Sequence, residues 1–137
     1  MIQATAQTQI TDNTDMKIGA VSMPRILLHL EGAAVLLTAL VLYSQHSGDW
    51  LVFALLLFVP DVSMVGYLMN KKMGAMLYNG VHTYPVPLVI IGTGLALTQP
   101  MIMSVGLILL AHIGIDRMVG YGLKYETDFK DTHMGRI

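Results

Sequence analysis

The sequence contains no cysteine and few charged residues. Without cysteine there are no disulfides, no thiolate metal sites and no thiol nucleophiles. Charged residues make up 12% of the chain, where soluble domains usually carry about 25%, and a net charge of -1 offers no basic surface to nucleic acid. Walker, GxGxxG and GxSxG motifs are also absent, so nucleotide binding and serine-hydrolase chemistry have no support. The chain is instead 54% hydrophobic with a mean hydropathy of +0.60, which favours one domain built from apolar segments.

Four long apolar runs lie between two polar ends. The runs cover residues 26–43, 50–69, 73–97 and 101–123, between an N-terminal arm over 1–24 and a tail over 124–137. About 20 residues are enough for a helix to cross a bilayer, and these runs are apolar on all sides rather than along one stripe. We therefore expect an all-α fold, a four-transmembrane-helix bundle over residues 25–123. A soluble helical bundle is the alternative. The arm lacks the basic start and apolar centre of a signal peptide, and we expect it to be flexible.

The basic residues predict the orientation of the bundle. Each lies before the first run, between the second and third, or close to or beyond the end of the fourth: Lys17, Arg25, Lys71, Lys72, Arg117, Lys124, Lys130 and Arg136. Cytoplasmic loops carry the excess of Lys and Arg in membrane proteins. We therefore expect both termini in the cytoplasm, and Arg117 to extend toward that face, with contact to a substrate phosphate or carboxylate as the alternative.

Five ionisable residues interrupt the apolar runs: Glu31, Asp61, His82, His112 and Asp116. A charge at bilayer depth costs roughly 2.5–3.5 kcal/mol, so such residues usually have a function. Counted from the nearest basic residue at about 1.5 Å per residue, all five lie roughly 9–18 Å from the cytoplasmic face. Helical spacing places Asp116 on the face of His112, and Asn79 near that of His82. Pro60, Pro85 and Pro87 loosen the backbone nearby.

Imidazoles and carboxylates that project inward from four helices are typical of metal sites in bundles. We expect Glu31, Asp61, His82, His112 and Asp116 to bind a divalent metal ion, Zn, Fe or Mn, with room for two ions. Two alternatives remain open at this point. The residues could form a proton or ion pathway, or a structural network of buried groups that satisfy one another. Tyr78, Tyr84 and Tyr121 could line the site or anchor the helices at the membrane interface.

An intramembrane metal site predicts a class of reaction. A metal-dependent hydrolase would use metal-activated water against an amphiphilic small molecule or membrane lipid, and an oxidase is a variant of the same idea. Glu31 and Asp61 are the candidate catalytic carboxylates, with Glu31 preferred as general base. A transporter or accessory subunit without enzymatic activity is the alternative, and the small size of the bundle would then favour a homodimer.

Several motifs resemble one family. They are LHLEG at 28–32, PDVSMVGY at 60–67, YNGVHTY at 78–84, AHIGIDRMVGYGLKY at 111–125 and FKDTHMGRI at 129–137. This pattern resembles the DUF4260 family, small bacterial integral membrane proteins of unknown function. The resemblance implies four helices and the bacterial inner membrane, but no activity. The Pro60–Asp61 step, the His82–Thr83 step and His112 with Asp116 are also remotely similar to inner-membrane proteins classed as metal-dependent hydrolases, although those carry further histidines around the His–Thr step.

Overall fold

The computed structural model describes residues 21–46 and 48–137, so the predicted arm over 1–24 lies almost wholly outside it. Every regular element in the described part is a helix. These elements are α2 (Met23–His46), α3 (Trp50–Leu57), the 3-10 helix η1 (Val59–Leu68), α4 (Lys71–Val81), α5 (Pro85–Ala96), α6 (Pro100–Val119) and the short 3-10 helix η2 (His133–Gly135). The β pairing there is limited to an isolated bridge between Lys124 and Thr132. The all-α prediction is therefore confirmed.

Three helical segments of the described chain are long and apolar enough to cross a membrane. They are Met23–His46, Trp50–Leu68 and Pro100–Val119. Large apolar side chains on their outer faces are exposed, with Leu37 at 63%, Leu55 at 68% and Leu68 at 85%. Apolar surface of this kind marks contact with a membrane or another protein. The helices therefore indicate a membrane protein, as the sequence predicts.

The predicted third span, residues 73–97, is divided into two helices. α4 has 11 residues and α5 has 12, and each is too short to cross a bilayer alone. The break follows from Pro85 and Pro87, which have no N–H to continue the hydrogen bonding of α4. The last turn of α4 closes instead with the N–H of His82 donating to the carbonyl of Tyr78 at 2.9 Å. The break leaves His82 at the C-cap of α4.

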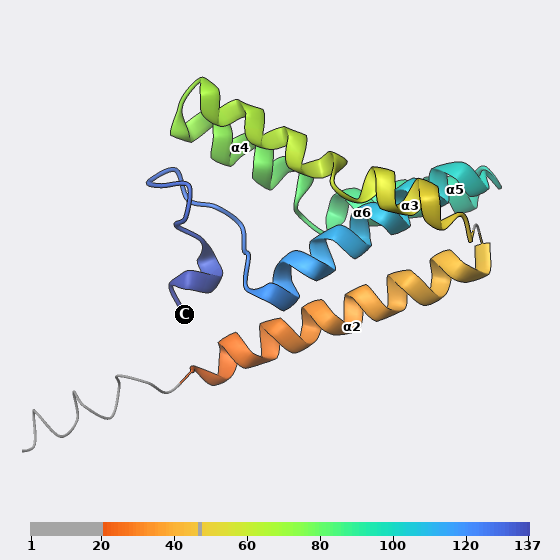
Figure 1. Ribbon diagram of the computed structural model, residues 1–137, viewed down its shortest axis with the longest axis horizontal. Helices are drawn as coiled ribbons and strands as arrows, with labels where there is room; N and C mark the ends of the chain where they lie inside the picture. The colour runs from red at the N-terminus through yellow and green to blue at the C-terminus, as the bar shows by residue number, and fades with distance from the viewer. Residues whose placement is uncertain (1–20, 47) are drawn as a thin grey trace, which may run out of the picture.

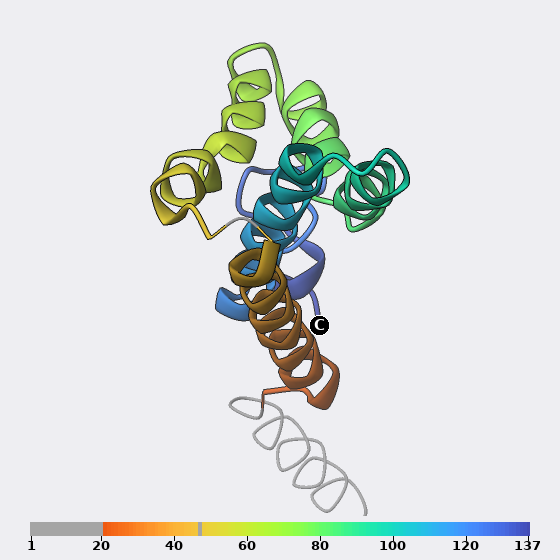
Figure 2. The same ribbon diagram turned by 90° about the vertical axis from the view of Figure 1, so that its right-hand side faces the viewer.

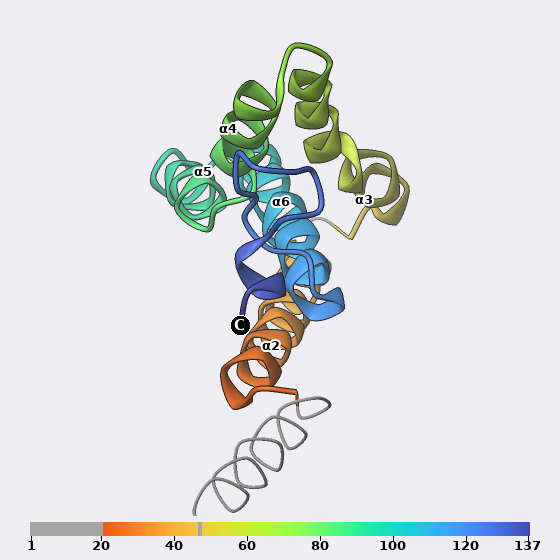
Figure 3. The same cartoon turned by 90° about the vertical axis from the view of Figure 1, so that its left-hand side faces the viewer.

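Helix α6 lies at the centre of the molecule. It packs against α2, α5 and α3, while α4 packs against η1 to form a hairpin. The end views show α6 surrounded by α2 on one side, by α3 and α5 on two others, and by the η1–α4 hairpin opposite α2 (Figures 2 and 3). α6 is accordingly the most buried of the three long apolar segments. Side chains on its inner faces can therefore meet side chains from several other helices.

Two glycines allow α2 and α6 to pack closely along their length (Figure 1). A Cβ added at Gly32 would lie 2.5 Å from the backbone nitrogen of Met118, and one added at Gly114 would lie 2.8 Å from that of Leu36. Real side chains do not approach so closely, so both positions require glycine. This contact turns the Gly32 face of α2, with Ala39 and Tyr43, toward α6.

Candidate metal centre

Four of the five predicted residues meet beside α6. Asp61 comes from the first turn of η1, His82 from the C-cap of α4, and His112 and Asp116 from one face of α6. The Nε2 atoms of the two histidines lie 3.0 Å apart. Asp61 Oδ1 lies 3.5 Å from each of these nitrogens, and Asp116 Oδ2 lies 3.8 Å from each. We call these four residues the His/Asp group.

The local backbone orients the ring of His82. The Nδ1 atom of His82 lies 2.8 Å from the carbonyl oxygen of Tyr78. Because a carbonyl oxygen only accepts, this nitrogen carries the proton, and the neutral ring has its lone pair on Nε2, directed into the group. His112 reaches the same point because α6 runs through the centre of the fold. The rings cross at 64°, with centroids 5.0 Å apart.

The separations within the His/Asp group fit a single metal ion. Ligand bonds of about 2.0–2.2 Å in a tetrahedral site place neighbouring donor atoms roughly 3.3–3.6 Å apart. The five measured separations run from 3.0 to 3.8 Å and so bracket this range. The donor atoms of Asp61, His82 and His112 all lie within 4.8 Å of one another, and this buried group could hold a metal ion.

Burial differs between the nitrogen and oxygen donors. The His82 side chain is fully buried and that of His112 is 4% exposed, whereas those of Asp116 and Asp61 are 14% and 34% exposed. The carboxylates border a cavity of about 260 Å³, lined by Asp61, Met64, Tyr78, Asp116, Tyr121, Lys124 and Phe129. We call it the polar cavity. The group is therefore closed on its imidazole side and open on its carboxylate side.

Tyr78 contacts two members of the group. Its hydroxyl donates to Asp116 Oδ2 at 2.9 Å, and its ring stacks on His82 with centroids 3.7 Å apart. Neighbours that hold ligands in place are a regular part of metal sites. The sequence left two roles open for Tyr78: it could line the site or anchor its helix at the membrane interface. Its spacing of four residues from His82 was the signal that could have identified it.

Arg117 is buried, and the prediction that it extends to the membrane surface is wrong. It is 5% exposed. Its guanidinium donates to the carbonyl of His82 at 3.1 Å and to that of Tyr121 at 2.8 Å. The break after α4 frees the His82 carbonyl from helical hydrogen bonding, and a buried carbonyl without a donor is costly. Arg117 therefore holds the chain at the break, through the backbone carbonyl of His82.

The structure does not bring Glu31 to the group. Its side chain is exposed on α2, and no hydrogen bond or ion pair within the described residues joins it to Asp61, His82, His112 or Asp116. The neighbouring residue Gly32 takes the position against α6 instead. His29, on the same helix, has its Nδ1 atom 2.7 Å from the carbonyl of Met118 and caps the last turn of α6. His29 therefore lies outside the His/Asp group.

The C-terminal tail closes over the open side of the group. Asn79, expected to point at the site, instead hydrogen-bonds the backbone of Lys124 twice, each time at 2.7 Å. His133 Nδ1 accepts from the N–H of Leu123 at 2.8 Å, and Met134 is fully buried. Figure 3 shows the tail lying between α2 and the η1–α4 hairpin. These contacts place Lys124 at the polar cavity, a position that sequence spacing did not indicate.

Lys124 is a buried cation beside two carboxylate-bearing residues. It is 8% exposed. Its ammonium lies 3.3 Å from the ring centroid of Phe129 and 4.5 Å from that of Tyr78. Its one hydrogen-bond acceptor among the described residues is the sulfur of Met64, at 4.0 Å. Burial lowers the pKa of Lys124 below its ordinary value, and Asp116 and Asp61 act in the opposite direction.

The fold and the site together define a small all-helical membrane protein with a buried His/Asp group that could hold a metal ion. The chain belongs to the family described as a domain of unknown function, DUF4260, whose model matches residues 25–137. The resemblance noted in the sequence is thereby confirmed over all but the N-terminal arm. No curated protein and no solved structure matches the chain.

Proposed function

We propose that the protein binds one divalent metal ion within the membrane, through Asp61, His82 and His112, with Asp116 as the fourth ligand. The observation that carries the proposal is the meeting of the two Nε2 atoms, 3.0 Å apart, with Asp61 Oδ1 3.5 Å and Asp116 Oδ2 3.8 Å from each of them. The lone pair that His82 directs into the group supports it, because a second imidazole nitrogen 3.0 Å away needs a proton or a cation between them.

The donor set limits the choice of metal. Two imidazoles and two carboxylates suit Zn, Fe or Mn, and a tetrahedral arrangement favours Zn. Two ions would have to sit about 3.5–4 Å apart and would need further bridging carboxylates. Glu31 was the predicted source of one, and it lies exposed on α2. We therefore propose a single ion.

A metal-dependent hydrolase is the activity that we assign to this site. If a water joined the four ligands on the open carboxylate side, the ion would lower the pKa of that water toward about 7, and the site would hold a nucleophile at neutral pH. The chain's own residues would hold the site in place: Tyr78 orients Asp116 and His82, and Arg117 fixes the backbone of His82. Asp61, the more exposed carboxylate, is the group best placed to face a substrate in the polar cavity. The reaction would take place in the bacterial inner membrane, with both termini in the cytoplasm and no nucleic acid involved.

Zinc competition against a chromophoric chelator tests the site in detergent-purified protein. We expect His82→Ala and His112→Ala each to weaken zinc binding by at least about a hundredfold, because each removes one of four ligands. His46→Ala is the matched control, since His46 is exposed and bonds only to the carbonyl of Leu42. Equal zinc affinity in all four proteins, with the fold intact, would overturn the ligand assignment.

A proton pathway is the second candidate. The His/Asp group and the Tyr78 hydroxyl form a continuous set of groups that can exchange protons, with separations of 2.9–3.8 Å. Proton flux into liposomes containing the purified protein distinguishes the two functions. Flux that disappears with Asp61→Asn, from a protein that binds no zinc, would favour the pathway. A transporter or accessory subunit, as a monomer or homodimer, would be consistent with that result.

A further inference from the structure

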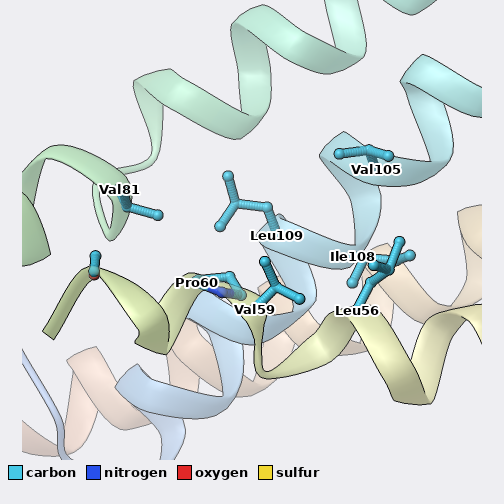
Figure 4. Close-up of a pocket in the computed structure, with 8 residues that line it drawn as sticks. Leu56, Val59, Pro60, Val81, Val105, Ile108 and Leu109 are labelled. Atoms are coloured by element: carbon cyan, nitrogen blue, oxygen red, sulfur yellow. The ribbon is translucent and has the colours of Figure 1, made fainter. Parts of the chain in front are cut away.

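A second cavity lies on the other side of the His/Asp group. It has a volume of about 310 Å³, which is within the range of small-molecule sites. Val59, Pro60, Val81, Val105 and Leu109 line it, and their side chains enclose it from η1, α4 and α6 (Figure 4). We call it the apolar cavity.

Helix α6 places the His/Asp group between the two cavities, and η1 and α4 contribute residues to both cavities. On α6, Val105 and Leu109 line the apolar cavity, and Asp116, two turns after Leu109, lines the polar one, with His112 between them. On η1, Pro60 and Ser63 line the apolar cavity, and Asp61 and Met64 line the polar one. On α4, Val81 lines the apolar cavity and Tyr78 the polar one, beside His82. Along α6, the apolar cavity, the group and the polar cavity therefore follow one another.

Each cavity contains one buried polar group that has no oxygen or nitrogen hydrogen-bond partner among the described residues. In the polar cavity, the ammonium of Lys124 has three N–H donors and, within the described residues, only a methionine sulfur to accept from it. In the apolar cavity, the buried hydroxyl of Ser63 has no hydrogen-bond partner. Buried donors without acceptors are costly, and a buried ammonium most of all. The ammonium of Lys124 therefore points to oxygen atoms supplied by a molecule bound in the polar cavity.

We propose that the site binds an amphiphile with one aliphatic chain and an anionic carboxylate or phosphate head. The chain occupies the apolar cavity, the head accepts hydrogen bonds from Lys124, and the segment between them passes the His/Asp group. The proposal rests on the proposed function, because the group between the cavities is the assigned metal centre. Lys124 is then a substrate-binding residue that the C-terminal tail delivers.

The arrangement also fits the way a lipid lies in a leaflet. The apolar cavity faces the middle of α6, whereas the polar cavity lies at the end of α6 where the tail folds back. An amphiphile held along α6 has its head at the tail end and its chain toward the centre of the helices. Transfer of the chain from lipid to the apolar cavity gains little free energy, because both are apolar. Lys124 therefore supplies most of the selectivity.

Photo-crosslinking in lipid nanodiscs tests the inference. The probe is dodecyl phosphate with a diazirine in its chain, and the labelled residues are mapped by mass spectrometry. We expect labelling to concentrate on the peptides that line the apolar cavity. Lys124→Met should weaken binding by about tenfold or more, since a hydrogen bond to a charged group is lost. Lys124→Arg should retain binding, and Lys130→Met, an exposed lysine of the same tail, is the control.

Filling the apolar cavity gives an independent variant. Val105→Trp should block chain labelling while leaving the zinc affinity of the same preparation unchanged. Labelling spread over lipid-facing residues and insensitive to Lys124→Met, in protein that binds zinc, would overturn the amphiphile site and leave the metal centre standing. Labelling that depends on Lys124 in protein without zinc affinity would instead support the amphiphile site and overturn the metal centre.

Discussion

The Nε2 atoms of His82 and His112 lie 3.0 Å apart, although the residues are separated by 30 positions and belong to different helices. His82 directs a lone pair into this contact, because its Nδ1 proton is bonded to the Tyr78 carbonyl. Two carboxylates flank the pair at 3.5 and 3.8 Å. A cation at this point would be bound by donor atoms of all four residues, and Tyr78 contacts two of them, His82 and Asp116.

Tyr78→Phe should weaken zinc binding by about 10- to 100-fold without removing a ligand. The hydroxyl that orients Asp116 is lost, while the ring stacked on His82 is kept, and changes in such supporting partners typically have this effect. Competition titration with a chelator measures the affinity. Tyr121→Phe is the control, because that ring is 61% exposed. If the two variants bound zinc equally well, Tyr78 would have no supporting role.

Gly114→Ala should destabilise the protein by about 1–3 kcal/mol, because its Cβ would lie 2.8 Å from the backbone nitrogen of Leu36 and force α2 away from α6. Gly92→Ala is the control, because it is the same substitution in a helix and its added Cβ would meet nothing within 4 Å. It should be neutral or slightly stabilising, since alanine favours helix. Thermal unfolding in detergent compares them. Equal melting temperatures would show that α2 does not pack against α6 at Gly114.

The C-terminal tail should loosen as the pH falls below about 6.5. Burial, and to a lesser extent Arg117, hold the pKa of His133 below its ordinary value of 6.5. The docked tail therefore binds fewer protons than the released tail, so docking is strongest above that pH and weakens as the pH falls toward the lowered pKa. Protonation of Nδ1 also removes the acceptor for the Leu123 N–H. Amide hydrogen exchange of the tail at pH 7.5 and 5.5 measures the effect.

Asp128 and Asp131 of the tail should not titrate in this window. Hydrogen bonds from Arg136 and Thr127 hold the pKa of Asp131 at about 2, and the Lys130 backbone and Lys71 lower that of Asp128. His133→Asn keeps an acceptor near the Leu123 N–H and carries no titrating group. It should make docking independent of pH over the same range. The same pH dependence in wild type and His133→Asn would assign the effect to a different group.

All four members of the His/Asp group were predicted from the sequence. An ionisable residue inside an apolar run can be assigned a depth in the membrane, and its spacing from other such residues shows whether they share a helix face. The sequence did not identify which face of α2 meets α6. Gly32, Ala39 and Tyr43 make that contact, and their spacing of seven and four residues was a helical signal. Adjacent positions on a helix point about 100° apart. Glu31 therefore lies off this face, although its depth matched the others.

The basic residues were counted as markers of orientation, which takes no account of their partners. Two of them are buried instead: Arg117 binds the carbonyl freed by the break after α4, and Lys124 packs among aromatic rings. The break itself was foreseeable from Pro85 and Pro87, but its consequence for Arg117 was not. The position of Lys124 depends on the tail, whose two hydrogen bonds to Asn79 join residues 45 positions apart. Spacing along one helix carries no information about such contacts.

Elemental analysis of the purified full chain tests the metal centre most directly. A four-ligand site of imidazoles and carboxylates should retain its ion through detergent purification, so we predict about one equivalent of zinc, iron or manganese per chain. The His82→Ala, His112→Ala double variant should contain almost none. Less than about 0.2 equivalents of any transition metal in the wild-type protein, even after incubation with each ion, would contradict the account.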